Sequence, residues 1–157
     1  MLAADCLKKT ELFEGLDEAQ LNALMAHSKV ERFPVGRIIF RQEEAATHLY
    51  LLIEGAVDLS VEAQEGLGLL ASHMQTEGAI FGTPSLLEPF RHRVTAKCIL
   101  PAKVLSIESS FLREKMAEDP KMGMRIMKKL ALIYYQRLND LRKGVVNFFK
   151  VFQMQTP

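Results

Sequence analysis

One stretch of the sequence, FGTPSLLEPFRHRVTA, combines residue types that bind anions. Its glycine permits a tight turn, and its Thr-Pro pair is typical of a helix start, because threonine caps helices and proline suits the first helical position. The free amide groups of such a start can hold an anion, and nearby arginines can add charge-assisted hydrogen bonds. The predicted contacts of a small anion are Gly82, Thr83, Ser85 and Arg91, with Arg93 as a reserve.

The direction of the two arginines decides what they do. In an extended strand, Arg91 and Arg93 share one face and His92 points to the other. If the arginines line the inner wall of the fold, two cations face a pocket and an anionic ligand is favoured. If they lie outside, they are ordinary surface charges, because arginine is buried only when it is paired. We favour the outside for Arg93, while both faces stay open for Arg91.

The middle of the chain, from Val30 to Ile107, must supply the scaffold for these residues. It consists of short apolar runs separated by Gly, Pro and acidic turns, which is typical of an all-β barrel or roll. Gly55 marks a bulge or a tight turn between two strands, and residues 63–66 are predicted to form a hairpin tip. The predicted strands are 29–33, 38–41, 49–54, 56–62, 67–74, 79–81, 93–98 and 102–107.

Helices are predicted on both sides of this region. Asp17 and Gln20 form a capping-box pattern at the start of a helix that runs to about Ser28, and a shorter helical piece ends near Gly15. After the strands, Ser109-Ser110 can cap a short helix that runs through Met116. We therefore expect one domain over residues 1–157, with a helical cap (1–28), a β-roll (29–108) and C-terminal helices (109–157).

The last helix opens at Asp119-Pro120 and is long. One set of its apolar residues recurs at alternating steps of four and three, the heptad pattern of a helix that pairs with another helix. This seam predicts a homodimer and comprises Met127, Ala131, Tyr134, Leu138, Leu141, Val145, Phe148 and Phe152. A second stripe, Ile126, Leu130 and Ile133, could pack on the roll. Alternatively, both stripes belong to one monomer core.

The amino-acid composition argues against some classes of function. The 157 residues carry 20 Lys and Arg against 19 Asp and Glu, so the whole chain has no long-range attraction for nucleic acid. The basic residues of the long helix could touch a membrane surface or nucleic acid, but a solvated face beside a dimer seam is favoured. Two cysteines and no run of ~18 apolar residues predict a soluble, cytoplasmic protein without a membrane span.

The sequence resembles the cyclic nucleotide-binding domain family, which includes catabolite-activator-like regulators, cyclic-nucleotide-dependent kinases and channels. The order of helical cap, β-roll and long helix is the family's order. The motifs that carry the resemblance cover nearly the entire chain: LFEGLDEAQLNAL (12–24), VERFPVGRIIFRQEEAATHLYLLIEGAVDL (30–59), FGTPSLL (81–87) and ALIYYQRLNDL (131–141). The resemblance implies a regulatory or sensor domain in which a ligand in the roll repositions the C-terminal helix.

The phosphate-binding cassette departs from the family pattern. The family cassette begins Phe-Gly-Glu, whose Glu accepts a hydrogen bond from the ribose 2′-hydroxyl, and ends in an Arg that binds the cyclic phosphate. Here Thr83 replaces the Glu, and the family Arg falls on Phe90, beside Arg91. Losing both charged partners removes roughly 3–6 kcal/mol, at ~1.5–3 kcal/mol each. Such a loss turns a micromolar ligand into a millimolar one, so binding of cyclic AMP or cyclic GMP is expected to be weak. Another small anion stays possible as the ligand.

The predicted function is therefore that of a non-enzymatic sensor domain. The competing prediction is a ligand-independent dimerisation or protein-interaction module with a vestigial pocket. The four histidines lack the spacing of a zinc site, and no nucleophile stands near a base and an orienting acid. Haem binding through His73-Met74 or Cys98 stays an open alternative, because some members of the wider family bind haem. The chain ends at Pro157, before any helix-turn-helix domain, so direct DNA binding is not expected.

Overall fold

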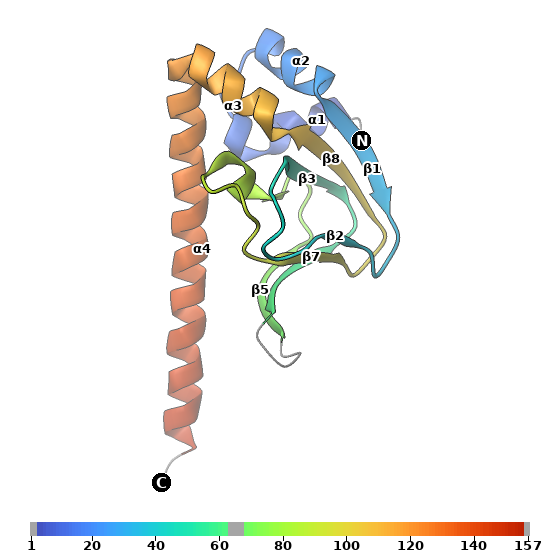
Figure 1. Ribbon diagram of the computed structural model, residues 1–157. Helices are drawn as coiled ribbons and strands as arrows, with labels where there is room; N and C mark the ends of the chain where they lie inside the picture. The colour runs from blue at the N-terminus through green and yellow to red at the C-terminus, as the bar shows by residue number, and fades with distance from the viewer. Residues whose placement is uncertain (1–2, 63–67, 156–157) are drawn as a thin grey trace.

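Two antiparallel sheets form the centre of the molecule in the computed structural model, which describes residues 3–62 and 68–155. Within those residues, eight strands make two four-stranded sheets that face each other as a roll (Figure 1). The first sheet has the order β1 (Ser28–Phe33), β8 (Ala102–Glu108), β3 (His48–Glu54) and β6 (Ile80–Phe81). The second has the order β2 (Ile38–Phe40), β7 (Thr95–Cys98), β4 (Val57–Glu62) and β5 (Gly68–Met74).

The structure confirms the predicted fold class, a β-roll flanked by helices. Each predicted strand matches one of the eight strands, although β7 begins at Thr95, two residues later than expected. The turn predicted at Gly55 joins β3 to β4, with a positive φ of 96° at the glycine. The hairpin tip predicted at residues 63–66 lies outside the described residues.

Helices cover one end of the roll. The N-terminal cap consists of α1 (Ala3–Lys9), the 3-10 helix η1 (Glu11–Phe13) and α2 (Glu18–Ala26). The predicted capping box is present, because the Asp17 carboxylate accepts from the Gln20 amide at 2.8 Å and the Asp17 amide donates to the Gln20 side chain at 2.9 Å. After β8 follow α3 (Ser109–Glu118) and α4 (Pro120–Met154).

The two caps predicted for the C-terminal helices had different outcomes. Asp119 caps α4 as expected, with its side chain accepting from the Met122 amide at 3.1 Å. The cap predicted at Ser109 is wrong. Ser109 is the first residue inside α3, whose N-cap position is Glu108, and its buried hydroxyl donates to the Ser85 hydroxyl instead.

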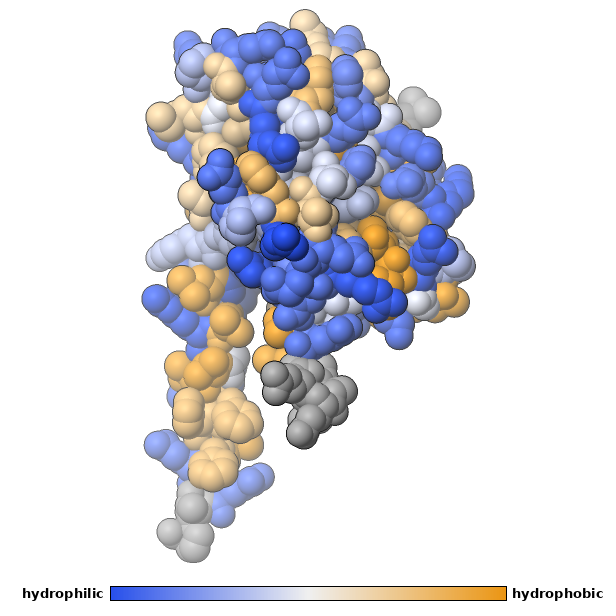
Figure 2. Space-filling view, in the orientation of Figure 1, coloured by the Kyte–Doolittle hydropathy of each residue, from blue (hydrophilic) through white to orange (hydrophobic). Residues whose placement is uncertain are grey.

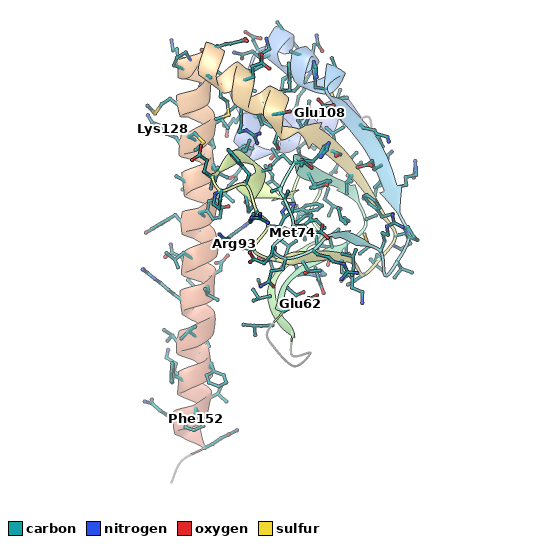
Figure 3. All side chains as sticks on the ribbon, in the orientation of Figure 1. Glu62, Met74, Arg93, Glu108, Lys128 and Phe152 are labelled. Atoms are coloured by element: carbon teal, nitrogen blue, oxygen red, sulfur yellow. The ribbon has the colours of Figure 1, made fainter. Side chains whose placement is uncertain are left out.

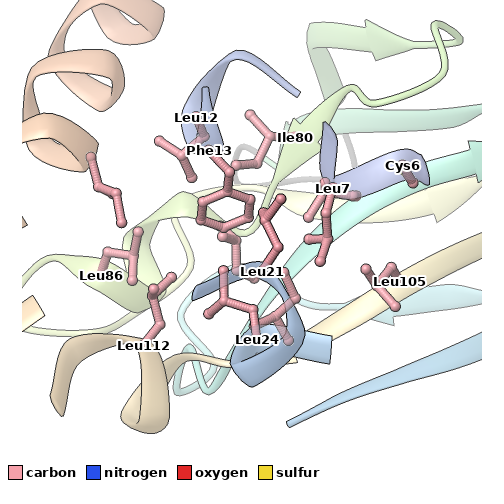
Figure 4. Packing of buried hydrophobic residues seen from close by; sticks show 14 of the residues in the cluster. Cys6, Leu7, Leu12, Phe13, Leu21, Leu24, Ile80, Leu86, Leu105 and Leu112 are labelled. Carbon is pink, nitrogen blue, oxygen red and sulfur yellow. The ribbon is translucent and has the colours of Figure 1, made fainter. Parts of the chain in front are cut away.

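Apolar side chains cover both faces of the first sheet. On β8, Leu105 and Ile107 face the helices, while Ala102 and Val104 face the second sheet, as the alternation of side chains along a strand requires. Figure 4 shows the helix-side cluster, in which side chains of the cap meet those of β6, β8 and α3. The predicted second stripe of α4 belongs to this cluster: Ile126 and Leu130 are buried there and Ile133 packs against it.

The rest of α4 extends along and beyond the roll (Figure 1). Its buried residues, Met122, Gly123, Ile126 and Leu130, all lie in the first third of the helix. Further along, Leu141 is 60% exposed and Phe148 is 67% exposed, and apolar side chains gather on this part of the surface (Figure 2). The predicted seam is therefore not buried within this chain, although its pairing with a second copy stays a prediction.

Candidate functional site

The cassette starts with a glycine turn at the end of β6. Gly82 has a φ of 74°, and a Cβ atom there would lie 2.9 Å from the backbone oxygen of His48, so both the conformation and the space favour glycine. The 3-10 helix η3 (Thr83–Leu86) follows, with Pro84 in its first turn. Gly82 occupies the N-cap position, so the possible capping role of the Thr83 hydroxyl is not realised.

The Thr83 side chain is buried and bound to α4. Its hydroxyl oxygen lies 2.6 Å from the Tyr134 hydroxyl. One helical turn further along α4, the Arg137 guanidinium donates to the backbone oxygen of Ile80 at 2.6 Å, and burial lowers the pKa of this arginine. Sequence reasoning missed both α4 contacts, because the partners are 51 and 57 residues apart.

A second set of contacts joins η3 to α3. The buried Ser85 hydroxyl accepts from Ser109 at 2.6 Å, and the Arg113 guanidinium donates to the Ser85 backbone oxygen. The Arg113 guanidinium also lies 4.2 Å from the centre of the Phe90 ring, which is cation–π geometry. The side chains of Thr83 and Ser85 are thus engaged by the two C-terminal helices.

Arg91 and Arg93 lie at the surface. Arg91 donates to the backbone oxygen of Glu43 at 2.9 Å, and Arg93 forms a salt bridge with the Glu43 carboxylate at 3.1 Å, with both side chains of that pair more than half exposed. Figure 3 shows Arg93 on the outside of the roll. Whether Gly82, Thr83, Ser85, Arg91 or Arg93 contacts a ligand stays a prediction.

His92 points the other way, into the roll. Its side chain is 3% exposed, and its ring stacks on Phe40 with ring centroids 3.6 Å apart. Burial lowers the pKa of His92 to about 4, with a smaller opposing effect from Glu44, so the imidazole is neutral at pH 7. Its Nδ1 atom has no hydrogen-bond partner among the described residues. The alternation of Arg91, His92 and Arg93 in the sequence is the signal that could have identified it.

Three more aromatic rings continue from His92 across the roll. Phe40 lies 5.7 Å from Tyr50 and 6.2 Å from Phe81, and Tyr50 lies 5.2 Å from Phe81, measured between ring centroids. We call Phe40, Tyr50, Phe81 and His92 the aromatic cluster. Burial raises the pKa of Tyr50 to about 12, with smaller contributions from Glu31 and Glu44. Its hydroxyl therefore stays protonated at neutral pH.

A groove of about 320 Å³ opens beside the aromatic cluster. Tyr50 forms part of its wall, and polar side chains of the first sheet form much of the rest, among them Lys29, Glu31, His48 and Ser106. In the sheet, Ser106 pairs with both Lys29 and Tyr50, so these three side chains stand in one row across β1, β8 and β3. The groove gives this end of the roll a polar opening.

The residues considered for haem are separated by the sheet. His73 lies on the outer side, where its two ring nitrogens contact Asp58 at 2.5 Å and Gln75 at 2.8 Å, and the hydrogen bond to Asp58 raises its pKa. Met74 and Cys98 are buried in the cluster between the sheets. Residues 3–62 and 68–155 contain no group of three His, Cys, Asp or Glu side chains placed to hold a metal ion. Among the same residues, no helix has the length and apolar content for a membrane span.

Comparison with known proteins places this geometry in a family. The family model for the cyclic nucleotide-binding domain matches residues 30–119, more than half of the chain. A CRP-like cAMP-activated global transcriptional regulator of Mycobacterium tuberculosis is 25% identical over 137 residues. Potassium channel KAT1 of Arabidopsis thaliana is 29% identical over 124 residues. These alignments cover 87% and 76% of this chain but only 61% and 17% of the relatives, so the chain spans less than two thirds of their length.

Solved structures agree with these matches. A candidate cyclic nucleotide-binding protein of Geobacter metallireducens superposes with a TM-score of 0.76 at 29% identity, covering 88% of this chain and 99% of that one. The sensor domain of the transcriptional regulator DNR from Pseudomonas aeruginosa has a TM-score of 0.73 at 23% identity, covering 86% and 90%, which shows the shared fold. The roll, its glycine-led cassette and its long C-terminal helix thus identify this chain as a member of the cyclic nucleotide-binding domain family.

Proposed function

We propose that this chain is a non-enzymatic sensor domain in which a ligand in the roll changes the position of α4, and that α4 pairs with α4 of a second copy. The observation that carries the proposal is the direct contact of the cassette with α4, through the hydroxyls of Thr83 and Tyr134. Arg137 adds a second contact to Ile80, one residue before the Phe-Gly pair. Movement of the cassette would therefore change the two contacts that hold α4 against the roll.

The seam of α4 supports the second half of the proposal. Tyr134 lies on this seam but is only 37% exposed, whereas Leu141 and Phe148, further along the helix, are 60% and 67% exposed. A pairing helix would remove these apolar side chains from water, and this burial would stabilise the dimer by ~25 cal/mol per Å² of apolar area. The seam thus includes Tyr134, the residue that contacts the cassette, and continues into the exposed part of α4, so a shift of α4 would change the geometry of the dimer.

Coupling between the cassette and α4 can be tested with Tyr134→Phe, which removes the hydroxyl and keeps the ring. We expect faster amide hydrogen exchange in residues 80–86 as well as in α4, because Thr83 loses its partner. Tyr135→Phe is the matched control, since this neighbouring tyrosine is 60% exposed, and it should leave both regions unchanged. An effect confined to α4 would contradict the coupling.

Dimerisation can be tested by sedimentation velocity. Wild type is expected to sediment as a dimer and Leu141→Glu as a monomer, because a carboxylate in an apolar seam loses its hydration. Leu132→Glu is the control. Leu132 is also an exposed leucine of α4, at 43%, but it lies off the seam, so this variant should remain dimeric. A wild-type monomer at high micromolar concentration would rule out pairing through α4.

A second candidate function is a ligand-independent interaction module. The observation that favours it is the aromatic cluster, whose rings occupy the interior of the roll next to the cassette. In that case the exposed apolar surface of α4 is the working surface and the pocket is vestigial. Dimerisation without any effect of Tyr134→Phe on the cassette would support this candidate over the sensor.

A further inference from the structure

The basic residues of α4 divide into two groups. This helix carries eight basic residues and one acidic residue, Asp140. Three of the basic residues bind the body of the molecule and hold the helix in place: Arg125, Lys129 and Arg137. The other five are exposed, and in the part of the chain that the structure describes none of them forms a salt bridge: Lys121, Lys128, Arg142, Lys143 and Lys150.

These five exposed cations lie on the side of α4 that faces away from the roll. Side chains on a helix advance by about 100° per residue, because a turn contains 3.6 residues. Leu130 is buried in the helix-side cluster and so marks the inner side of α4. Counted from Leu130, the five cations lie between about 120° and 220° around the helix, which centres them on the opposite side. Their charges therefore point outward along the length of α4.

Exposed apolar side chains lie among these cations. By the same count, five of them are found between about 100° and 200° from Leu130, and they are Met124, Leu132, Tyr135, Val146 and Phe149. Even the least exposed of them, Leu132, is 43% exposed, and none belongs to the predicted seam. We call the five exposed cations and these five apolar residues the outer stripe.

Val146 shows how closely the two kinds of residue alternate. Residues three and four positions apart are neighbours on a helix surface. The neighbours of Val146 are therefore Arg142 and Lys143 on one side, and Phe149 and Lys150 on the other. An ordinary solvated face would not need the apolar members of this group, so the outer stripe calls for a partner that is both anionic and apolar.

An anionic lipid surface has this combination of properties. Its headgroups carry negative charge, and the boundary of the hydrocarbon lies just beneath them. The long stems of lysine and arginine let their charges reach the headgroups while neighbouring apolar side chains enter that boundary. Nucleic acid would attract the cations through its phosphates but would leave the apolar residues without a role. A second copy of the outer stripe would place cations against cations.

We propose that the outer stripe of α4 binds the surface of a membrane that contains anionic lipid, with the helix lying along that surface. The roll and the other helices lie together on one side of α4 (Figure 1), so they do not obstruct the opposite side. The predicted seam uses other residues of the helix, so pairing and lipid binding are compatible. This inference goes beyond the proposed function and does not require it.

Flotation of the purified chain with lipid vesicles tests the proposal. One set of vesicles is phosphatidylcholine alone, and the other contains equal amounts of phosphatidylcholine and phosphatidylglycerol. Binding to the mixed vesicles is expected to be at least about a hundredfold tighter, at roughly fivefold for each basic residue near an anionic surface. Added salt should reduce this preference, because it screens the charges. Equal binding to both sets, or no binding to the mixed vesicles, would overturn the proposal.

The charged part of the outer stripe is tested by Lys143→Gln combined with Lys150→Gln. This variant should bind the mixed vesicles about 25-fold more weakly, at roughly fivefold for each lysine. Lys29→Gln combined with Lys97→Gln is the matched control, because it changes the net charge equally but replaces two exposed lysines of the roll. The control should bind like wild type. If both variants lose the same affinity, binding follows net charge and the outer stripe is not the contact.

The apolar part is tested by Val146→Gln combined with Phe149→Gln, which keeps every charge. Loss of the two apolar side chains should weaken binding to the mixed vesicles at least about tenfold. Val35→Gln combined with Leu100→Gln replaces two exposed apolar residues outside α4 and should have no effect. Suppose instead that a DNA duplex binds as tightly as the mixed vesicles and that Val146→Gln with Phe149→Gln changes neither affinity. The outer stripe is then a nucleic-acid site, and the proposal is wrong.

The outcomes separate this inference from the proposed function. All of these substitutions lie off the seam, so each variant should show the oligomeric state of wild type in sedimentation velocity. A wild-type monomer that binds the mixed vesicles would contradict the proposed pairing and leave the lipid contact standing. A wild-type dimer that ignores the mixed vesicles would do the reverse.

Discussion

Replacement of Gly55 by alanine is expected to lower the free energy of unfolding by on the order of 4 kcal/mol, near the upper end of what single substitutions cause. The added Cβ would lie 2.2 Å from the Pro101 oxygen and 2.8 Å from the Ala102 Cα, and the φ of 96° is itself unfavourable for alanine. Both conflicting atoms belong to the backbone where β8 begins, so no side-chain rotation relieves them. Since domains are typically stable by only ~5–15 kcal/mol, a large share of the stability is at stake.

Gly36 provides the matched control for this substitution. It also has a positive φ, 85°, but a Cβ there would have no atom within 4 Å. Gly36→Ala should therefore cost only the backbone term, about 1–2 kcal/mol. Urea unfolding followed by circular dichroism gives both values. If the two variants lose equal stability, the close approach of Gly55 to the start of β8 is incorrect.

Stability is expected to fall between pH 6.5 and pH 4 because of His92. Its pKa is about 4 in the fold and 6.5 for an unperturbed histidine, so the unfolded chain binds a proton in this window and the folded chain does not. The contribution of His92 is complete above pH 6.5 and is lost as the pH falls towards 4. At 1.36 kcal/mol per pKa unit, the loss reaches about 3 kcal/mol.

His92→Phe isolates this effect from the titration of carboxylates. The variant keeps the stack on Phe40 and has no group that titrates at this position, so its free energy of unfolding should depend less on pH than that of wild type. The difference between the two proteins, measured by urea unfolding at pH 7.0, 5.5 and 4.5, should grow in favour of the variant as the pH falls. A constant difference would show that folding does not lower the pKa of His92.

The scaffold could be predicted from the sequence because its signals are local. The capping box at Asp17 and Gln20 spans four residues, and Asp119 with Pro120 starts α4 where expected. The strands could be predicted from short apolar runs between turns, because the alternation of side chains is a local property of each strand. The cap at Ser109 failed for a non-local reason, because its hydroxyl binds Ser85, 24 residues earlier in the chain.

The site was less predictable than the scaffold, because the inward or outward direction of its side chains depends on a segment of irregular backbone. β7 begins only at Thr95, and Phe90 has a positive φ of 55°, so counting back from a regular strand cannot fix which of residues 91–93 faces inward. The alternation of side chains along an extended chain correctly placed Arg91 and Arg93 on one face and His92 on the other. It could not tell which of these two faces points into the roll. The contact of Thr83 with Tyr134 was out of reach for the same reason as the Ser109 contact: the fold, not the local sequence, brings the two together.

Among the residues that the structure describes, the hydrogen bonds that join the cassette to α4 involve no acidic side chain. One joins two hydroxyls, those of Thr83 and Tyr134, and the other joins a guanidinium to the backbone oxygen of Ile80. Ion pairs at a surface weaken as dissolved salt screens their charges, and neither of these two contacts is an ion pair. We therefore expect ionic strength to weaken the connection between the roll and α4 less than it would weaken a surface salt bridge.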